Sequence, residues 1–198
     1  MSQHPLEIDP IIGGWLPDLS GMKVLDLGCG KGSLGLLLRQ APGGLHAHLT
    51  GAEIFQPNID FVRRFNIYDE ILEGDITKRD QWPEFDIVVA CEILEHLSRD
   101  AGERLLTRLE EHTQKVIVST PNGRDLRGPI GGNPAEAHLS VWTVADFKTR
   151  GYQVLGVGSL LRRSNRRHGL SAVVWHVSTP FAHRIPRIAG NLVARRGF

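Results

Sequence analysis

Hydrophobic residues fall into two alternating patterns along this chain. Short continuous apolar runs are typical of strands that are buried on both faces of a sheet. Such runs lie at residues 24–27, 71–72, 86–91 and 115–119, and further strands are predicted at residues 46–54, 152–157 and 170–177. Between several of these runs, apolar residues spaced three and four positions apart predict helices. The predicted helices cover residues 33–40, 57–65, 101–112 and 143–150.

The alternation of strands and helices predicts an α/β fold. We expect a Rossmann-like three-layer sandwich, in which a mostly parallel seven-stranded sheet lies between two layers of helices. No helical pattern separates the last two predicted strands, so the last strand is expected to be antiparallel. The 198 residues suit a single domain, 1–198. Within it we expect an N-terminal lid or helix at 1–20, an acceptor loop at 123–142 and a loosely docked basic tail at 179–198.

A glycine-rich segment follows the first predicted strand. Residues 24–32 read VLDLGCGKG, and glycines after a strand allow the backbone to approach a ligand closely. Gly30, Gly32 and Gly35 also spell G-x-G-x-x-G, the pattern of dinucleotide sites. An oxidoreductase that binds a nicotinamide dinucleotide is therefore one interpretation of this segment.

Three acidic residues favour a different cofactor. Asp26 precedes the first glycine by two positions, where a carboxylate can face a cationic amino group rather than a pyrophosphate. Glu53 ends the second predicted strand and is placed to bind ribose hydroxyls. Asp75 follows the third predicted strand and can accept a hydrogen bond from an adenine amine. The chain also has no second domain of the size that dehydrogenases carry.

In this order, residues 24–32, Glu53, Asp75 and the block at 85–97 resemble the class I S-adenosylmethionine-dependent methyltransferases. The resemblance runs from about residue 23 to residue 177 and implies S-adenosylmethionine as the cofactor. By this resemblance the amino-acid end of the cofactor lies at Asp26, Gly28 and Gly30, and the ribose at Glu53. The remaining cofactor-binding residues that we expect are Asp75, Ile76 and Cys91.

The segment at 91–97, CEILEHL, leaves the fourth predicted strand at its carboxyl end, where open parallel sheets bind ligands. If a helix begins here, Glu92, Glu95 and His96 fall on one face at positions i, i+3 and i+4. These side chains can hold a divalent ion, or the acids can cap the first turn of the helix.

The E-x-x-E-H pattern resembles that of ubiquinone-type O-methyltransferases and of small-RNA 3′-terminal 2′-O-methyltransferases. In the RNA enzymes these three residues and a later histidine bind Mg²⁺, which implies Glu92, Glu95, His96 and His138 as metal ligands here. Without a metal, His138 is expected to contact substrate or anchor its loop. For catalysis we expect His96, His138 and Glu92, with either an imidazole or the metal activating a substrate oxygen.

The resulting hypothesis is O-methylation of a hydroxyl on a small molecule, such as a sugar or a quinone-like or phenol-like compound. A Mg²⁺-dependent RNA ribose 2′-O-methyltransferase is the alternative, although the chain shows no separate RNA-binding domain. A non-catalytic cofactor-binding protein is a further alternative, which the three intact acids disfavour.

The charges of the chain are distributed unevenly. Residues 1–146 contain 13 Lys/Arg and 22 Asp/Glu, whereas residues 147–198 contain 10 Lys/Arg and no acid. The basic segment is suited to an anionic acceptor or to nucleic acid; alternatively, the two segments simply neutralise each other on the surface. Four of its arginines lie close together in the sequence: Arg162, Arg163, Arg166 and Arg167.

Composition favours a cytoplasmic protein. Hydrophobic residues make up 41% and charged residues 23%, as in ordinary globular proteins. No apolar run approaches the roughly 20 residues that span a bilayer, and the N-terminal residues do not resemble a secretory signal. The two cysteines, Cys29 and Cys91, do not indicate a disulfide framework.

Overall fold

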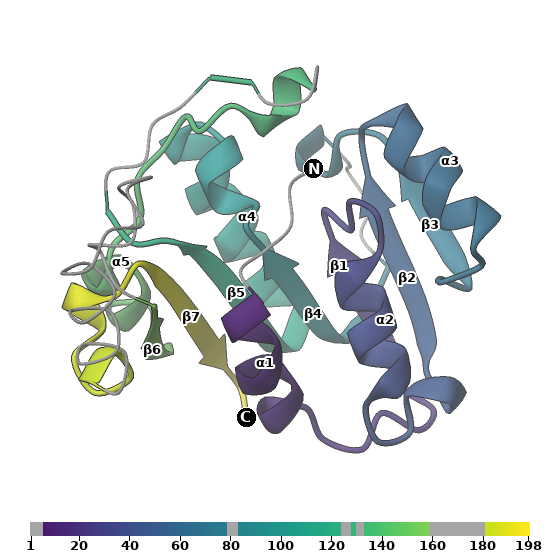
Figure 1. Ribbon diagram of the computed structural model, residues 1–198, viewed down its shortest axis with the longest axis horizontal. Coiled ribbons are helices and arrows are strands. Elements are labelled where there is room, and N and C mark those ends of the chain that lie inside the picture. Colours follow the sequence, from purple (N-terminus) through teal and green to yellow (C-terminus); the bar gives the residue numbers. More distant parts are fainter. Residues whose placement is uncertain (1–5, 79–82, 124–127, 130–132, 159–180) are drawn as a thin grey trace, which may run out of the picture.

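A seven-stranded sheet runs through the centre of the molecule (Figure 1). The computed structural model describes residues 6–78, 83–123, 128–129, 133–158 and 181–198. The strands are β1 (Lys23–Leu27), β2 (His48–Glu53), β3 (Glu70–Glu73), β4 (Phe85–Cys91), β5 (Thr113–Pro121), β6 (Gln153–Val157) and β7 (Asn191–Arg196). Their order across the sheet is β3-β2-β1-β4-β5-β7-β6. The first five strands pair in parallel, and β7 is antiparallel to both β5 and β6.

Helices cover both faces of the sheet, which confirms the predicted three-layer fold. The α-helices are α1 (Asp9–Trp15), α2 (Ser33–Gln40), α3 (Gln56–Arg64), α4 (Arg99–His112) and α5 (Val144–Lys148). Short 3₁₀ turns include η1 (Leu6–Ile8), η2 (Gly44–His46), η3 (Ile76–Lys78), η4 (Leu94–His96), η5 (Pro134–Glu136) and η7 (Pro186–Ile188). Among the described residues, no helix has the length and apolar character to cross a membrane.

The core explains how the two layers form. In β4, Ile87 and Val89 pack into one apolar cluster with α1, α2 and α3, whereas Val88 and Ala90 pack into a second cluster with α4 and α5. Successive residues of a strand point to opposite faces, so a continuous apolar run supplies both clusters at once. All four of these side chains are completely buried.

Most predicted elements lie within one to three residues of the observed ones, and the helix at Ser33–Gln40 has the predicted bounds. Thr143 caps the start of α5: the backbone N–H of Thr143 donates to Asp146 Oδ2 at 2.7 Å. At the other end, Gly151 has a φ of +82°, a value that ends the helical path.

The end of the chain differs from the prediction. The last strand was expected at residues 170–177, which lie outside the described residues, and a loosely docked tail at 179–198. Instead, Asn191–Arg196 form β7, inserted between β5 and β6, with Leu192, Val193 and Ala194 fully buried. An apolar run of three residues followed by two arginines is too short to indicate a strand by pattern alone. The antiparallel last strand is confirmed, but a different segment forms it.

The N-terminal segment packs against the sheet as a helix. Pro10 lies in the first turn of α1, where its missing N–H costs no hydrogen bond. Ile8 and Ile12 are fully buried in the same apolar cluster as α2. The guanidinium of Arg195 in β7 lies 4.8 Å from the ring centre of Trp15, so the two ends of the chain meet on this face.

Candidate active site

A cavity of about 260 Å³ opens where the parallel strands end. Because β1, β2, β3 and β4 run in parallel, their carboxyl ends meet at one edge of the sheet. Six residues that the sequence placed around a cofactor line this cavity: Gly28, Gly30, Glu53, Asp75, Ile76 and Cys91. Glu92 and His96 line it as well, whereas Asp26, Glu95 and His138 do not belong to its wall.

The glycine turn after β1 is formed by close backbone contacts. The backbone N–H groups of Gly28 and Cys29 both donate to Ala52 O at 2.9 Å, which ties the turn to the end of β2. Gly28 has a φ of +75°, and a Cβ atom there would lie 1.9 Å from Ile93 Cδ1. Only glycine therefore fits at Gly28, both for conformation and for space.

The carboxylate of Glu53 fixes the same turn from the opposite side. Its Oε2 accepts from the backbone N–H of Gly30 at 2.9 Å and from Asn58 Nδ2 at 3.2 Å. Its Oε1 accepts from the backbone N–H groups of Ile54 and Phe55, both at 2.8 Å. Glu53 is 8% exposed and borders the cavity, so its oxygens lie within reach of a bound ligand.

Asp75 stays ionised at the entrance to η3. Burial by itself would raise the pKa of this carboxyl, but hydrogen bonds from Thr77 and the charge of Lys78 outweigh it and lower the pKa below its usual value. Asp75 Oδ1 accepts from the Thr77 hydroxyl at 2.6 Å, and Oδ2 lies 3.3 Å from Lys78 Nζ. A charged acceptor is thus present at the end of β3.

Asp26 lies behind the glycine turn rather than in the cavity. It is 2% exposed, and its Oδ2 accepts a hydrogen bond of 2.5 Å from the hydroxyl of Tyr68. Burial, followed by the nearby charge of Asp26, raises the pKa of Tyr68, so the hydroxyl keeps its proton and remains a donor. The sequence did not single out Tyr68, which packs from the segment before β3 against Gly35 and Gly51.

Replacing Tyr68 with phenylalanine is expected to destabilise the fold by about 1–3 kcal/mol, because a buried carboxylate loses a hydrogen-bond donor. Urea unfolding of Tyr68→Phe and wild type measures the difference as a shift in midpoint at constant slope. Equal midpoints would show that the hydrogen bond to Asp26 contributes nothing to stability.

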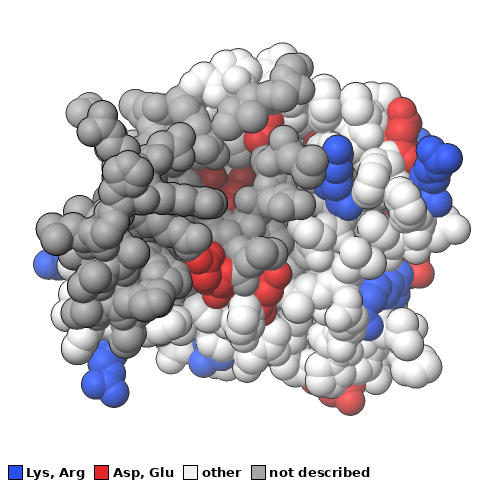
Figure 2. Space-filling model, viewed as in Figure 1, with Lys and Arg blue, Asp and Glu red and all other residues white. Residues whose placement is uncertain are grey.

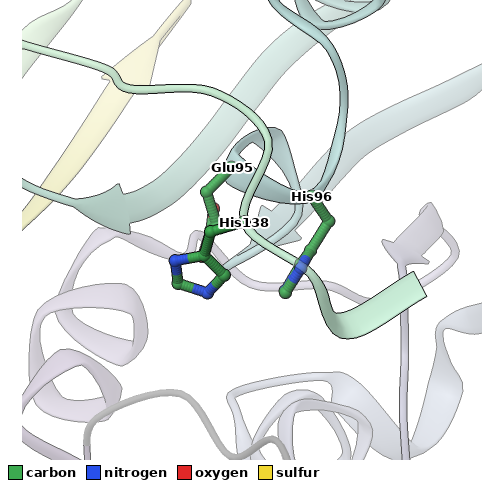
Figure 3. A group of neighbouring side chains, drawn as sticks. All are labelled: Glu95, His96 and His138. Atoms are coloured by element: carbon green, nitrogen blue, oxygen red, sulfur yellow. The ribbon is translucent and has the colours of Figure 1, made fainter. Parts of the chain in front are cut away.

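A second group of side chains lies next to the cavity (Figure 3). Glu95, His96 and His138 each offer a ligand atom, and these atoms lie within 4.8 Å of one another. The two imidazoles meet edge to face, with ring centres 4.9 Å apart. Glu95 and His138 are buried, at 2% and 4% exposed, while His96 reaches the cavity wall. His138, which is 42 positions after His96 in the chain, thus joins Glu95 and His96 in a compact cluster of one carboxylate and two imidazoles.

Hydrogen bonds hold the two segments of this cluster together. Glu95 O accepts from the backbone N–H groups of Leu139 at 2.6 Å and Ser140 at 3.1 Å. The Ser140 hydroxyl donates to Leu94 O and accepts from Trp142 Nε1, both at 2.9 Å. Trp142, the last residue of the predicted acceptor loop, is completely buried. It anchors the segment that carries the second histidine.

The tautomer of His96 follows from its backbone partner. Its Nδ1 lies 3.2 Å from Ala137 O, and a carbonyl oxygen can only accept. We therefore assign the proton to Nδ1, which leaves the lone pair of the neutral ring on Nε2. A lone pair at this nitrogen is what a proton acceptor or a metal ligand requires.

Glu92 does not join this cluster, contrary to the helical spacing. Its φ of +54° lies in the left-handed region, so no helix begins there, and only the short turn η4 follows. Its carboxylate accepts from Ser119 Oγ at 2.8 Å and from Asn191 Nδ2 at 3.1 Å. Three neighbouring strands, β4, β5 and β7, thereby fix Glu92 in the cavity wall. Such strain in a non-glycine residue is typical of functional sites.

The segment Ser119-Thr120-Pro121-Asn122 at the end of β5 supports the site with each polar side chain. Ser119 donates to Glu92, and the Thr120 hydroxyl donates to Glu95 Oε2 at 3.0 Å. Asn122 Nδ2 donates to Ala189 O at 2.9 Å and to Pro186 O at 3.0 Å, which holds η7 against the sheet.

Other residues of the site were missed for a common reason. Tyr68, Asn133, Glu136 and Asn191 all contact the site from loops or from a strand that the sequence pattern did not indicate. Only the Gly/Pro-rich composition of residues 123–142 pointed to this loop, and Asn133 and Glu136 come from it. The basic cluster at residues 162–167 lies outside the described residues.

Known proteins share this architecture. A family model described as a methyltransferase domain matches residues 24–115. The mitochondrial ubiquinone biosynthesis O-methyltransferase of Mus musculus is 37% identical over 89 residues, which are 40% of this chain and 23% of the mouse protein. The ubiquinone biosynthesis O-methyltransferase of Thiobacillus denitrificans is 31% identical over 106 residues, or 48% of this chain and 44% of that protein. The matched segment thus spans less than half of either relative.

A solved structure extends the likeness of fold to almost the whole chain. The crystal structure of a SAM dependent methyltransferase from Archaeoglobus fulgidus gives a TM-score of 0.62 at 17% identity and covers 96% of this chain and 92% of that chain. The sheet order and the cavity at the strand ends define a Rossmann-like, methyltransferase-type domain. Together with the family match, these likenesses make the chain similar to the class I S-adenosylmethionine-dependent methyltransferases and, among them, to the ubiquinone-type enzymes.

Proposed function

We propose that this chain transfers the methyl group of S-adenosylmethionine to a hydroxyl oxygen of a small molecule such as a sugar or a phenol-like compound. The observation that carries the proposal is the cavity that the glycine turn, Glu53 and the imidazole of His96 all border. The similarity to ubiquinone biosynthesis O-methyltransferases supports an oxygen as the methyl acceptor.

The cofactor is proposed to lie along the ends of the strands. Gly28, Gly30 and Cys91 would border its amino-acid end, and Glu53 its ribose, with Asp75 and Ile76 at the adenine. For Asp26 the hydrogen bond to Tyr68 supports an indirect role: it stabilises the glycine turn from behind instead of contacting the ligand. The site residues would align the sulfonium, the methyl group and the attacking oxygen, and such alignment supplies up to about 7–11 kcal/mol in favourable cases.

Loss of the proton from the acceptor hydroxyl is assigned to the histidines. The Nε2 lone pair of His96 can take this proton, because Nδ1 holds its own on Ala137 O. His138 contacts the His96 ring edge to face and would stabilise its orientation or share the proton. Glu92, fixed by Ser119 and Asn191, is proposed to contact the acceptor from the cavity wall.

The cluster of Glu95, His96 and His138 also fits a divalent cation. One carboxylate and two imidazoles within 4.8 Å of one another are a suitable donor set, with water or substrate in the remaining positions. Two nitrogen donors favour a metal such as Mn²⁺ over Mg²⁺, which prefers oxygen ligands. We propose these three residues as the metal ligands. The sequence resemblance implies Mg²⁺ as the metal and Glu92 as a fourth ligand, which lies outside the three-residue cluster. When bound, the cation would lower the pKa of the acceptor hydroxyl.

Isothermal titration with S-adenosylmethionine and S-adenosylhomocysteine, with and without Mg²⁺ or Mn²⁺, tests the cofactor. We expect micromolar binding to the wild type, with about tenfold or greater loss in Glu53→Ala, because the glycine turn loses its acceptor. Transfer of a labelled methyl group to catechol or methyl glucoside then tests the acceptor class. Failure of both ligands to bind would contradict the proposal. Titration with NADH would then test the alternative of an oxidoreductase that binds a nicotinamide dinucleotide.

An RNA ribose 2′-O-methyltransferase remains the alternative, because its expected metal ligands include the three clustered residues. Binding of a short RNA with steep salt dependence, of slope about −0.7 per phosphate neutralised, would favour it over a small-molecule acceptor. We propose a cytoplasmic location, which the free thiols of Cys29 and Cys91 support.

A further inference from the structure

A buried tryptophan follows the second imidazole of the candidate site by four positions. Trp142 is completely buried, and His138 joins Glu95 and His96 in the cluster of Figure 3. The indole Nε1 of Trp142 donates to the Ser140 hydroxyl at 2.9 Å, within the short segment that separates the two residues. The position of the ring therefore bears on the position of this segment and of the imidazole that it carries.

A glycine of α4 leaves room for the indole. Gly102 is buried inside α4, where glycine is less favourable for a helix than alanine. A Cβ atom at Gly102 would lie 2.5 Å from Cζ2 of Trp142 and 3.3 Å from its Cη2. The indole thus packs directly on the backbone of the helix, and a larger residue at position 102 would displace it, because protein interiors have no spare space.

An arginine of the same helix contacts the ring as well. Lys and Arg side chains on the face in Figure 2 lie mostly toward its edges, whereas Asp and Glu gather in the middle. Arg99 is half-buried instead, and its guanidinium carbon lies 4.0 Å from the ring centre of Trp142. Its Nη1 donates to Val141 O at 2.9 Å, and its Nη2 donates to Asp146 Oδ1 at 2.6 Å. The first turn of α4 therefore holds both the ring and the backbone next to it.

The two segments of the cluster are thus joined at two places. At one place His96 Nδ1 lies 3.2 Å from Ala137 O, and at the other the indole of Trp142 packs on Gly102. His138 lies between these two attachments in the chain, and its ring meets that of His96 edge to face. A displacement at either attachment is transmitted to His138, since a close-packed core moves its neighbours rather than absorbing the change.

We propose that Gly102 and Arg99 position the imidazole of His138 through the ring of Trp142. Both are then positioning residues of the reaction, although neither belongs to the cavity wall. This inference rests on the proposed function, because that function assigns the proton of the acceptor hydroxyl to the two imidazoles. It also gives a reason for a glycine inside α4, a position at which helix propensity alone favours alanine.

NMR spectra of the histidine rings test the positioning without any turnover. The ring signals of His96 and His138 are assigned with a glutamine variant of each. In Gly102→Ala the added methyl group displaces the indole, so both signals should shift by more than those of the other histidines. Gly14→Ala is the matched control: it makes the same change at an exposed glycine of α1, where nothing lies within 4 Å of a Cβ atom. Its spectrum should keep both signals unchanged.

Turnover with catechol or methyl glucoside tests the consequence for the reaction. Gly102→Ala should lower kcat about tenfold or more, because small misplacements of a catalytic group can cost about 100-fold, and KM for S-adenosylmethionine should stay within about twofold. Trp142→Phe removes Cζ2, so adding Gly102→Ala to it should lower kcat by less than about twofold further. Arg99→Lys keeps the charge but loses the planar contact with the ring, and it should shift the same signals and lower kcat.

Three results would overturn the proposal. These are unchanged signals of both imidazoles in folded Gly102→Ala, shifted signals with unchanged kcat, or a loss of kcat that is equally large in the Trp142→Phe background. If Gly102→Ala does not fold, Arg99→Lys provides the same two readouts, and unchanged signals there overturn the proposal. A wild type that neither binds S-adenosylhomocysteine nor transfers a methyl group contradicts the proposed function instead, which is a distinct outcome.

Discussion

Replacing His96 with glutamine is expected to lower methyl-transfer turnover by about two to four orders of magnitude, the usual contribution of a general base. The amide of glutamine can still donate to Ala137 O, but it has no lone pair of suitable basicity in place of Nε2. Affinity for S-adenosylhomocysteine should stay within about threefold of wild type, because His96 is not among the residues at which we place the cofactor. Steady-state turnover with catechol and titration of the product cofactor measure the two quantities separately.

His112→Gln provides the matched control. This histidine is exposed at the end of α4 and does not line the cavity, so turnover should be unchanged. If His96→Gln instead retains near-normal turnover and His96→Ala does not, the imidazole serves only to hold Ala137 and the segment that carries His138. Proton removal would then have to be assigned to another group.

Turnover of Glu95 and His138 variants, measured with and without added Mn²⁺, separates a metal from a general base. Glu95 and His138 are buried behind His96 and do not form part of the cavity wall. If they hold a cation together with His96, their substitution lowers turnover in a way that excess Mn²⁺ partly restores. If His96 acts alone as a base, added metal changes nothing.

The parts of the fold that the sequence could predict are those with a strong local signal. The apolar run at 86–91 supplies both faces of the core, and the glycine turn needs its positive φ values, so their position follows from the residues themselves. By contrast, β7 has only three apolar residues, and its pairing with β5 and β6 is decided by the sheet edge that those strands leave open. Tertiary context, rather than pattern, places such a strand.

The candidate site shows the same division. The order of Gly28, Glu53 and Asp75 along alternating strands was enough to bring them to one sheet edge. The helical spacing of Glu92 and Glu95 was misleading, because the chain turns through a left-handed conformation at Glu92 before η4 begins. Residue spacing also could not predict that the Glu92 carboxylate pairs with Asn191, which is 99 residues away in the chain.

Gly28→Ala is expected to weaken binding of S-adenosylhomocysteine by about 30-fold to 1,000-fold, which corresponds to roughly 2–4 kcal/mol. Two effects act at this position: backbone strain, which lowers stability as it does at Gly21, and overlap with Ile93, which bears on binding. An L-residue at a φ of +75° is strained by about 1–2 kcal/mol, and the added methyl group would overlap Ile93 Cδ1 at 1.9 Å. Because Gly28 and Ile93 both line the cavity, relief of the overlap moves atoms of the site itself. Titration calorimetry on the folded variant measures the loss.

Gly21→Ala separates strain from overlap. Gly21 has nearly the same φ, +73°, but nothing lies within 4 Å of a Cβ atom there, and it is not part of the cavity. Its variant should lose a similar amount of stability from backbone strain and bind S-adenosylhomocysteine as wild type does. The double variant Gly28→Ala/Ile93→Ala should recover part of the lost affinity, since it removes the overlap and leaves the strain. Wild-type affinity in Gly28→Ala would mean that the cofactor does not approach the turn after β1, and the roles proposed for Gly30 and Glu53 would fall with it.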